Sequence, residues 1–305
     1  MTDYTSLDRR FGALIVGHAK LERLWTGARW TEGPAYFAAG RYLVFSDIPN
    51  DRIMRYDETS GVVSVFREHA RHTNGHTVDH QGRLISCEHR GRGVSRTEHD
   101  GRVVMLATHA EGKRFNSPND VVVKSDGSIW FTDPTYGIDS DYEGDAAVSE
   151  IGACNVYRLD PETKALTVVV TDRVRPNGLA FSPDERTLYV SDTGASHLDG
   201  HPRSITAYTA SSDGRSVSGS RMFAVSDAGF FDGFRCDVHG NVWTSTGEGV
   251  RCYASDGTHI GTVKVPEMVS NVCFGGLKCN RLFITAQTSL YSIFLSTTGA
   301  AGVAK

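Results

Sequence analysis

The hexapeptide YLVFSD at residues 42–47 is the first copy of a strand-like unit that returns along the whole chain. Each copy is a short run rich in apolar, β-branched or aromatic residues, which is typical of a β-strand. The other copies are RLISCE at 83–88, SIWFTD at 128–133, TLYVSD at 187–192, NVWTST at 241–246 and RLFITA at 281–286. Repeats of roughly 40 to 60 residues with three or four strands each indicate propeller blades. Six copies therefore predict an all-β chain that forms a six-bladed β-propeller.

Further strand patterns around each copy complete four-stranded blades. A fourth strand follows five of the units, at 62–67, 103–108, 166–171, 221–226 and 260–265. The sixth unit lacks one, whereas the N-terminal segment 21–25 has strand character and precedes the first blade. We expect this segment to close the ring, because closure removes an exposed edge strand. The predicted organisation is a single propeller domain over residues 1–305, with residues 1–20 as an N-terminal extension.

Charge and composition narrow the class of protein. The 305 residues carry a formal net charge of −4 with the charged residues scattered, so we expect neither a nucleic-acid nor a membrane partner. No apolar run approaches the roughly 20 residues of a membrane-spanning helix. The six cysteines lack CxxC spacing and are expected to be buried free thiols. We expect a cytoplasmic protein, with an exported form whose signal has been processed as the alternative, and the oligomeric state stays open.

The strand that opens each unit begins with a polar residue at a shared position. These six residues are Glu32, Asn74, Asn119, Asn177, Asp232 and Asn271. In a propeller the first strand of every blade lines the axis, so we expect the six side chains to converge at one end of the channel. Each offers an oxygen atom and two are acids, a set that suits one Ca²⁺ ion best. Mg²⁺, Mn²⁺ or, less suitably, Zn²⁺ are the alternatives.

A simpler interpretation is that Asn or Asp before Gly only sets up a turn. It accounts for one or two of the positions, but Glu32 is a poor turn residue and shares the register of the other five. We therefore predict Glu32, Asn119, Asn177 and Asp232 as metal ligands. Asn74 and Asn271 are expected to hydrogen-bond the substrate, a water molecule or the ligands.

Five motifs resemble one known family over nearly the whole chain. They are TEGP at 31–34, RFNSPNDVVV at 114–123, WFTDPTYG at 130–137, RPNGLAFSPD at 175–184 and DGFRCDVHGNVW at 232–243. They are similar to the senescence-marker-protein-30, gluconolactonase and luciferin-regenerating-enzyme-like hydrolases, and most of all to the bacterial gluconolactonase branch. The resemblance implies that the matching Glu, two Asn and Asp bind a catalytic divalent metal. It also implies sugar-hydroxyl contacts for Arg114 and Asn116, although the spacing around Arg114 departs from the vertebrate branch.

Opening a lactone requires a polarised carbonyl, an attacking water and a proton for the leaving alkoxide. Asp232 is the candidate catalytic base, as a ligand through one oxygen and a proton acceptor through the other. The alternative is that Asp232 is a ligand only. His76 lies two residues after Asn74, so strand alternation turns it toward the channel. It either contacts the substrate or fills the channel by hydrogen bonds to neighbouring blades.

Two insertions interrupt the repeat, at 134–155 and 193–203. We expect them to form a lid over the metal end of the channel. The first insertion nearly fits a calcium-loop pattern between Asp139 and Glu150, but strands flank it, so an acidic solvated loop is favoured over a second metal site. His197 and His201 in the second insertion are expected to face solvent.

The sequence contains no G-x-S-x-G, H-E-x-x-H or phosphate-loop motif. The predicted function is a gluconolactonase-like carboxylic ester hydrolase that opens a small lactone such as D-glucono-1,5-lactone with one divalent metal ion. The first alternative is the same chemistry on other lactones, aryl esters or phosphotriesters, because the similar squid-type organophosphate hydrolase shares the four-ligand arrangement. The second alternative, a non-catalytic binding propeller, has no need of a ring of oxygen ligands.

Overall fold

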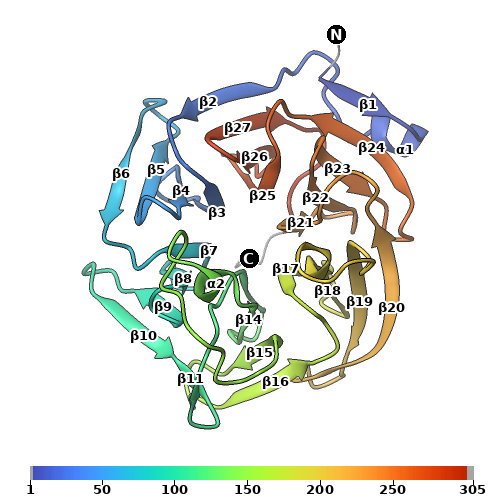
Figure 1. The fold of residues 1–305 in the computed structure, drawn as a ribbon. Helices are drawn as coiled ribbons and strands as arrows, with labels where there is room; N and C mark the ends of the chain where they lie inside the picture. Colours follow the sequence, from blue (N-terminus) through green and yellow to red (C-terminus); the bar gives the residue numbers. More distant parts are fainter. Residues whose placement is uncertain (1–2, 301–305) are drawn as a thin grey trace.

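The computed structural model describes residues 3–300, and it contains six antiparallel sheets set around a central axis (Figure 1). In each sheet the strands follow one another from the axis to the rim, and the innermost strands of neighbouring blades pack together around the axis. The predicted six-bladed β-propeller is therefore confirmed. The predicted domain limits at residues 1 and 305 lie outside the described residues.

The blades are numbered here in chain order, and their strands are given from the axis outward. The first three blades contain β3 (Thr31–Phe37), β4 (Tyr42–Asp47), β5 (Arg52–Asp57) and β6 (Val63–Glu68); β7 (Thr73–Val78), β8 (Leu84–Glu88), β9 (Gly93–Thr97) and β10 (Val103–Ala107); and β13 (Val121–Val123), β14 (Ile129–Asp133), β15 (Asn155–Leu159) and β16 (Leu166–Val170). The last three contain β17 (Pro176–Phe181), β18 (Thr187–Asp192), β19 (Ser204–Ala210) and β20 (Val217–Val225); β21 (Phe234–Cys236), β22 (Val242–Thr246), β23 (Gly249–Tyr253) and β24 (His259–Lys264); and β25 (Val269–Gly275), β26 (Arg281–Ala286) and β27 (Ser289–Phe294). The remaining elements are β1 (Tyr4–Ser6), β2 (Glu22–Thr26), the hairpin β11 (His109–Ala110) and β12 (Lys113–Arg114), the short helices α1 (Arg9–Gly12) and α2 (Tyr136–Asp139), and a 3₁₀ turn at Gly194–Ser196.

The N-terminal segment closes the ring as the sequence predicts. Strand β2 pairs antiparallel with β27 and supplies the outer strand that blade 6 lacks, with Glu22 opposite Ser292. Strand β1 adds a fifth strand to the rim of blade 5. Behind it, the fully buried Phe11 fills a socket above Gly261, where a Cβ atom would come within 2.3 Å of the ring. Residues 3–20 of the extension are thus packed on blades 5 and 6.

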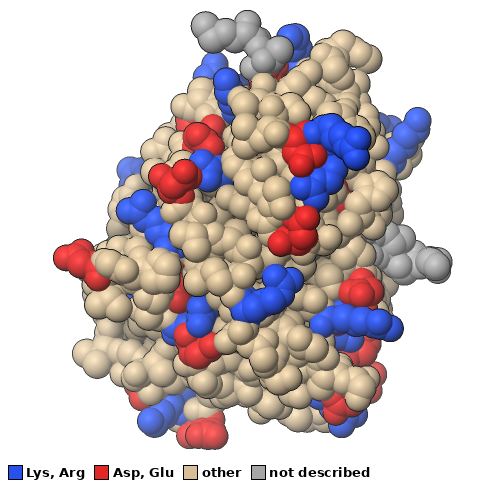
Figure 2. All heavy atoms as spheres, turned by 90° about the vertical axis from the view of Figure 1, so that its right-hand side faces the viewer, with Lys and Arg blue, Asp and Glu red and all other residues tan. Residues whose placement is uncertain are grey.

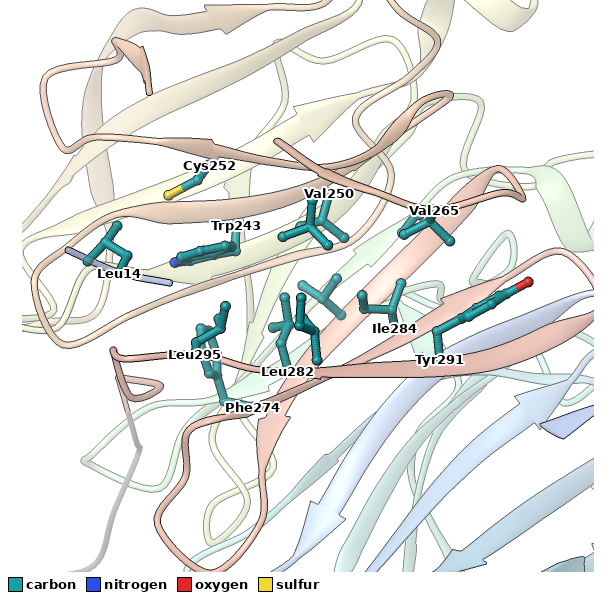
Figure 3. Packing of buried hydrophobic residues seen from close by; sticks show 14 of the residues in the cluster. Leu14, Trp243, Val250, Cys252, Val265, Phe274, Leu282, Ile284, Tyr291 and Leu295 are labelled. Atoms are coloured by element: carbon teal, nitrogen blue, oxygen red, sulfur yellow. The ribbon is translucent and has the colours of Figure 1, made fainter. Parts of the chain in front are cut away.

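The hydrophobic core is divided into clusters that lie largely between neighbouring blades. The largest lies between blades 5 and 6, where Trp243 and Val250 face Leu282, Ile284 and Tyr291 (Figure 3). These side chains come from alternate positions of β22, β23, β26 and β27, which is the pattern that the repeated strand predicts. The six cysteines are free, as expected, and three of them are buried while three are partly buried.

The surface carries mixed charge. On the face drawn in Figure 2, basic and acidic side chains are interspersed, without a large patch of one sign. Within residues 3–300, no helix is long and apolar enough to cross a membrane.

Candidate active site

The six polar residues that open the blades gather at one end of the channel. Five of them line a cavity of about 210 Å³, namely Glu32, Asn74, Asn119, Asn177 and Asp232. The sixth, Asn271, lies behind Glu32, and its Nδ2 donates a hydrogen bond of 3.0 Å to Glu32 Oε2. The structure therefore brings the four predicted metal ligands and Asn74 to one site, and Asn271 orients the Glu32 carboxylate.

Irregular inner strands aim these side chains. Strands β3, β7, β17 and β25 each shift register against their partners at or beside the ring residue, as at a β-bulge. A bulge turns a side chain out of the regular alternation, here toward the cavity. The strand repeat predicts the register, but it contains no signal for the bulges.

The glycines after several ring residues allow neighbouring blades to approach closely. A Cβ atom on Gly75 would come within 2.4 Å of the Asn119 carbonyl oxygen, and one on Gly178 within 2.2 Å of the Asp232 carbonyl oxygen. The N–H groups of these glycines donate to the same oxygens, at 2.7 and 3.1 Å. Both glycines lie inside strands with ordinary φ angles. The turn interpretation of these Asn-Gly pairs is therefore wrong, because contact between inner strands requires the glycines.

The acid that ends the repeated strand braces the loop before the ring residue. Asp133 accepts hydrogen bonds from the backbone N–H groups of Asn116 and Ser117, at 3.0 and 2.9 Å. Asp192 accepts from the N–H groups of Val174 and Arg175, at 3.0 and 2.9 Å. These bonds fix the backbone two or three residues before Asn119 and Asn177. The repeat thus both builds the blade and positions the site.

The two acids of the ring, the buried Glu32 and the partly buried Asp232, face each other, and neither forms an ion pair in the described part of the chain. Burial, followed by the charge of Asp120, raises the pKa of Glu32. Burial, followed by the charge of Glu32, raises the pKa of Asp232 well above its ordinary range. Asp120 itself is paired with Arg235 at 3.1 Å. The electrostatics of the ring therefore favour an added cation.

The residues fit a hard divalent cation. The ring offers carboxylate and amide oxygens only, the donor set that Ca²⁺ and Mg²⁺ prefer over Zn²⁺. Asn74 Oδ1 is buried without a hydrogen-bond partner in residues 3–300. Over the same residues, no three His, Cys, Asp or Glu side chains form a potential metal cluster, although Glu32, Glu143 and Asp232 line one cavity. Metal binding by the ring stays a prediction.

Three further predicted residues lie away from the cavity wall. His76 is fully buried, and its two ring nitrogens are each 2.8 Å from a hydroxyl, those of Ser46 and Ser86 in blades 1 and 2. These contacts match the alternative in which His76 fills the channel. Arg114 lies in the β11–β12 hairpin, and its backbone N–H donates to Glu150.

Asn116 uses its whole side-chain amide within the protein. Its Nδ2 donates to the carbonyl oxygens of Asp133 and Ala153, at 3.0 and 2.8 Å. Its Oδ1 accepts from the Ser149 hydroxyl at 2.6 Å. Asn116 therefore anchors the first insertion, and both polar atoms of its amide have partners within the protein.

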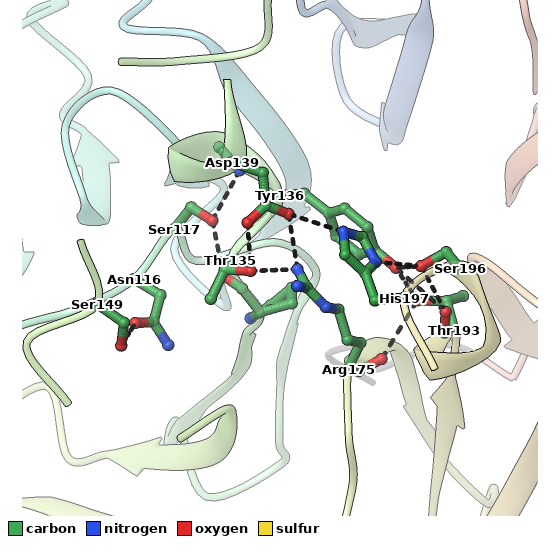
Figure 4. A network of polar contacts seen from close by, with 12 residues as sticks. Asn116, Ser117, Thr135, Tyr136, Asp139, Ser149, Arg175, Thr193, Ser196 and His197 are labelled. Carbon is green, nitrogen blue, oxygen red and sulfur yellow. Dashed lines mark hydrogen bonds and ion pairs between the residues drawn. The ribbon is translucent and has the colours of Figure 1, made fainter. Parts of the chain in front are cut away.

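Both insertions reach the cavity, where the sequence places a lid. Tyr136 and Glu143 of the first insertion and Thr193 and Ser196 of the second are among the lining residues. The Tyr136 hydroxyl joins the two insertions, at 2.7 Å from Thr193 Oγ1 and 2.9 Å from Ser196 Oγ (Figure 4). The Arg175 guanidinium lies over the Tyr136 ring, 5.2 Å from its centroid.

The acidic loop of the first insertion is largely exposed, as the sequence predicts, with Glu143 as the exception. Asp139 pairs with Arg175 at 2.7 Å and Glu150 with Arg92 at 3.5 Å. The first and last acids of the calcium-loop pattern therefore form separate ion pairs. Glu143 lines the cavity instead, and burial raises the pKa of its carboxyl to about 7.

The two histidines of the second insertion differ in their surroundings. His201 lies 3.0 Å from Asp192 with its side chain 17% exposed, so the prediction that it faces solvent is wrong. The reason is that Asp192, which braces the loop before Asn177, also accepts from His201. His197 is more exposed and lies 3.3 Å from Asp139.

Sequence reasoning missed the apolar wall of the cavity. The wall is formed by Trp30, Ile48, Phe230, Met268 and Val269. Trp30 and Phe230 each stand two residues before a ring acid. Strand alternation places such residues on the same side as the acid, so the sequence contained a signal for them. Tyr136 lies within the motif WFTDPTYG.

The fold is a six-bladed propeller, and its cavity under two loops is lined by oxygen atoms. These features define a propeller with a site for a small molecule. Residues 30–288 match the family described as the SMP-30/Gluconolactonase/LRE-like region, and the chain belongs to this family. It is 30% identical over 318 residues to the gluconolactonase of Zymomonas mobilis subsp. mobilis, covering 97% of this chain and 86% of that protein.

Two further relatives are named as lactonases. The solved structure of a gluconolactonase from Xanthomonas campestris is 38% identical, with a TM-score of 0.88 over 96% of each chain. The pentonolactonase of Haloferax volcanii is 29% identical over 269 residues, which cover 85% of this chain and 82% of the relative. With this likeness over nearly its full length, the chain is a gluconolactonase-like lactone hydrolase.

Proposed function

We propose that this enzyme opens D-glucono-1,5-lactone or a close aldonolactone, using one divalent ion, Ca²⁺ first, held by Glu32, Asn119, Asn177 and Asp232. One observation carries the metal: two acids with raised pKa values share a small cavity with amide oxygens, and neither forms an ion pair among residues 3–300. Regucalcin of Agrobacterium tumefaciens, a calcium-binding protein, has the same fold at 20% identity and a TM-score of 0.74. The choice of Ca²⁺ rests on the oxygen ligands of this chain.

The protein groups have separate roles in the reaction. When bound, the ion supplies a Lewis acid for the lactone carbonyl and acidifies water. Asp232 accepts a proton from the attacking water while the water oxygen bonds to the carbonyl carbon. The proton then passes to the ring oxygen as the ring C–O bond breaks. Ser245 Oγ, 2.7 Å from the Asp232 backbone nitrogen, fixes this residue, and Asn271 fixes Glu32.

The apolar wall supports the same chemistry on a wider set of substrates as a second candidate. Trp30, Phe230 and Met268 line the cavity. Their side chains would pack against an aryl or alkyl group of a substrate. Other lactones, aryl esters and phosphotriesters belong to this candidate. Activity on these, without activity on aldonolactones, would favour it.

The test is metal-dependent acid release from D-glucono-1,5-lactone, measured at fixed pH against the spontaneous reaction. EDTA-treated protein should be inactive, and Ca²⁺, Mg²⁺ or Mn²⁺ should restore activity. The variants Glu32→Gln and Asp232→Asn should lose at least about 100-fold in kcat/KM, because each removes ligand charge. Neither opens a core cavity, so the circular dichroism spectrum should stay that of the wild type.

Full turnover of either variant after metal depletion would contradict the site assignment. Metal-dependent cleavage of aryl esters alone would keep the site and change the substrate. Inactivity with every metal and every ester would favour a binding propeller.

A further inference from the structure

His89, directly after β8, joins the ring to the lid. It is fully buried, with Nε2 3.1 Å from Asn74 Nδ2 and Nδ1 3.1 Å from the Glu143 carbonyl oxygen. A carbonyl oxygen can only accept, so Nδ1 carries a proton. Burial lowers the pKa of His89 to about 4, so the ring is neutral and Nε2 is an acceptor. Asn74 must therefore turn its NH₂ group to His89.

The orientation of Asn74 leaves its oxygen without a donor. Asn74 lines the cavity and is 5% exposed, and its Oδ1 has no hydrogen-bond partner in the described chain. The reverse orientation of the amide would require a proton on Nε2 and would set an unprotonated Nδ1 against the Glu143 carbonyl. A buried acceptor without a partner is costly, so Oδ1 favours a ligand that donates.

The Glu143 carboxylate is a second acceptor in the same cavity. Within residues 3–300 it has neither a hydrogen-bond donor nor a basic partner, although it lines the cavity. Its backbone is held tightly. A Cβ atom on Gly144 would come within 2.1 Å of the Gly137 carbonyl oxygen, and one on Gly137 within 2.4 Å of His89 Cβ. Close packing therefore fixes the backbone from which the Glu143 side chain extends.

We propose that Asn74 Oδ1 and the Glu143 carboxylate form an acceptor wall that selects lactones with hydroxyl groups on the ring, and that His89 is the positioning residue for both. The inference rests on the proposed function and names the residues that decide its substrate class. Ring hydroxyls donate to the two acceptors. A lactone or ester without hydroxyls leaves both acceptors desolvated and unpaired, and a site built for hydrogen bonds rejects such a ligand.

The experiment compares kcat/KM for D-glucono-1,5-lactone and δ-valerolactone, which have the same ring with and without hydroxyls. Glu143→Met should lower the value for gluconolactone about 10- to 100-fold, the loss of one charged hydrogen bond. The value for δ-valerolactone should rise, because the variant removes an acceptor that this substrate leaves unpaired. Glu143→Gln keeps an acceptor oxygen and should fall between Glu143→Met and the wild type.

The matched control is Asp145→Asn, in the same loop. The Asp145 side chain is 65% exposed and pairs with Arg90, so both kinetic values should match the wild type. His89→Gln should lower the preference for gluconolactone over δ-valerolactone, a ratio that a general loss of folding does not change. Equal losses on both lactones for Glu143→Met, or no loss on either, would overturn the inference.

A binding measurement separates this inference from the proposed reaction. Trp30 lines the cavity, so tryptophan fluorescence can report binding of 1,5-anhydro-D-glucitol, with tetrahydropyran as the hydroxyl-free probe. If the wild type hydrolyses neither lactone but binds the polyol, and Glu143→Met does not, the proposed reaction fails and the acceptor wall stands. A wild type that binds the polyol no better than tetrahydropyran would refute the wall.

Discussion

At the scale of single residues, chemically similar polar groups acquire different tasks from their surroundings. Asn74 and Asn271 occupy equivalent positions in blades 2 and 6, yet one presents an oxygen to the cavity and the other donates to Glu32. The partner on the far side of each amide decides the difference: His89 for Asn74 and the backbone N–H of Val272 for Asn271.

The buried His76 leads to a prediction about the pH dependence of stability. Burial, with a smaller effect of the Arg67 charge, lowers the pKa of His76 from 6.5 to about 3. The unfolded chain takes up the proton below pH 6.5 and the folded chain does not, so this residue makes stability fall as the pH drops from 6.5 toward 3. Between pH 7.5 and 5.0 the loss is about 2 kcal/mol.

The measurement is urea unfolding of the wild type and His76→Gln at these two pH values. The variant should lose about 2 kcal/mol less free energy of unfolding on acidification, because all other titrating groups are shared. The amide of Gln can pair with the hydroxyls of Ser46 and Ser86, which keeps the channel filled. The same pH dependence in both proteins would show that His76 is protonated in the folded state.

At the scale of elements, the lid is two insertions held to each other and to the ring. Tyr136 in α2 bonds the turn at 194–196, and the Arg175 guanidinium lies over its ring. The same arginine pairs with Asp139 at the end of α2. Neither insertion has a sheet of its own, so these contacts across the cavity fix the lid.

Tyr136→Phe tests this arrangement, because it removes the hydroxyl and keeps the ring. Loss of two neutral hydrogen bonds should raise KM for gluconolactone about 3- to 10-fold and leave kcat nearly unchanged. Amide hydrogen exchange of residues 193–203 should become faster. Tyr142→Phe is the matched control, since Tyr142 lies in the same insertion, is 54% exposed and has no hydroxyl partner in residues 3–300.

Identical exchange rates and KM values for the two Tyr→Phe variants would contradict a coupling of the loops through Tyr136. A fall in kcat for Tyr136→Phe with unchanged KM would assign the hydroxyl to the chemical step instead.

At the scale of the whole molecule, the ring depends on a strand from the opposite end of the chain. Blade 6 receives its outer strand from residues 22–26, more than 260 positions before its partner residues. Without β2, the edge of β27 would be exposed, and Leu24 and Trp25 would leave the cluster around Phe45 and Leu290. An uncovered edge of this kind invites aggregation.

A chain that lacks residues 1–27 should therefore aggregate or elute as an oligomer in size-exclusion chromatography, and it should not unfold cooperatively on heating. Removal of residues 1–7 alone takes away β1, an addition to a blade that already has four strands. That control should stay folded, with a modest loss of thermal stability. If the longer truncation gave a soluble protein as stable as the control, ring closure by β2 would be unnecessary for the fold.

The sequence by itself determined the number of blades, the ring closure and the six positions around the channel. These features follow from a local rule: strand alternation fixes which residues face each way, and the repeat applies the rule six times. Glu32, Asn119, Asn177 and Asp232 could be placed together because an equivalent position in each inner strand has to reach the same axis.

Only the tertiary structure decided what lies outside the repeat. Glu143, His89 and the partly buried His201 belong to loops whose paths depend on contacts with distant segments, such as the bond from His89 to the Glu143 carbonyl oxygen. The close approach that requires Gly75 and Gly178 likewise arises between blades. No periodic pattern encodes such contacts, because they depend on how side chains pack in space rather than on their spacing along the chain.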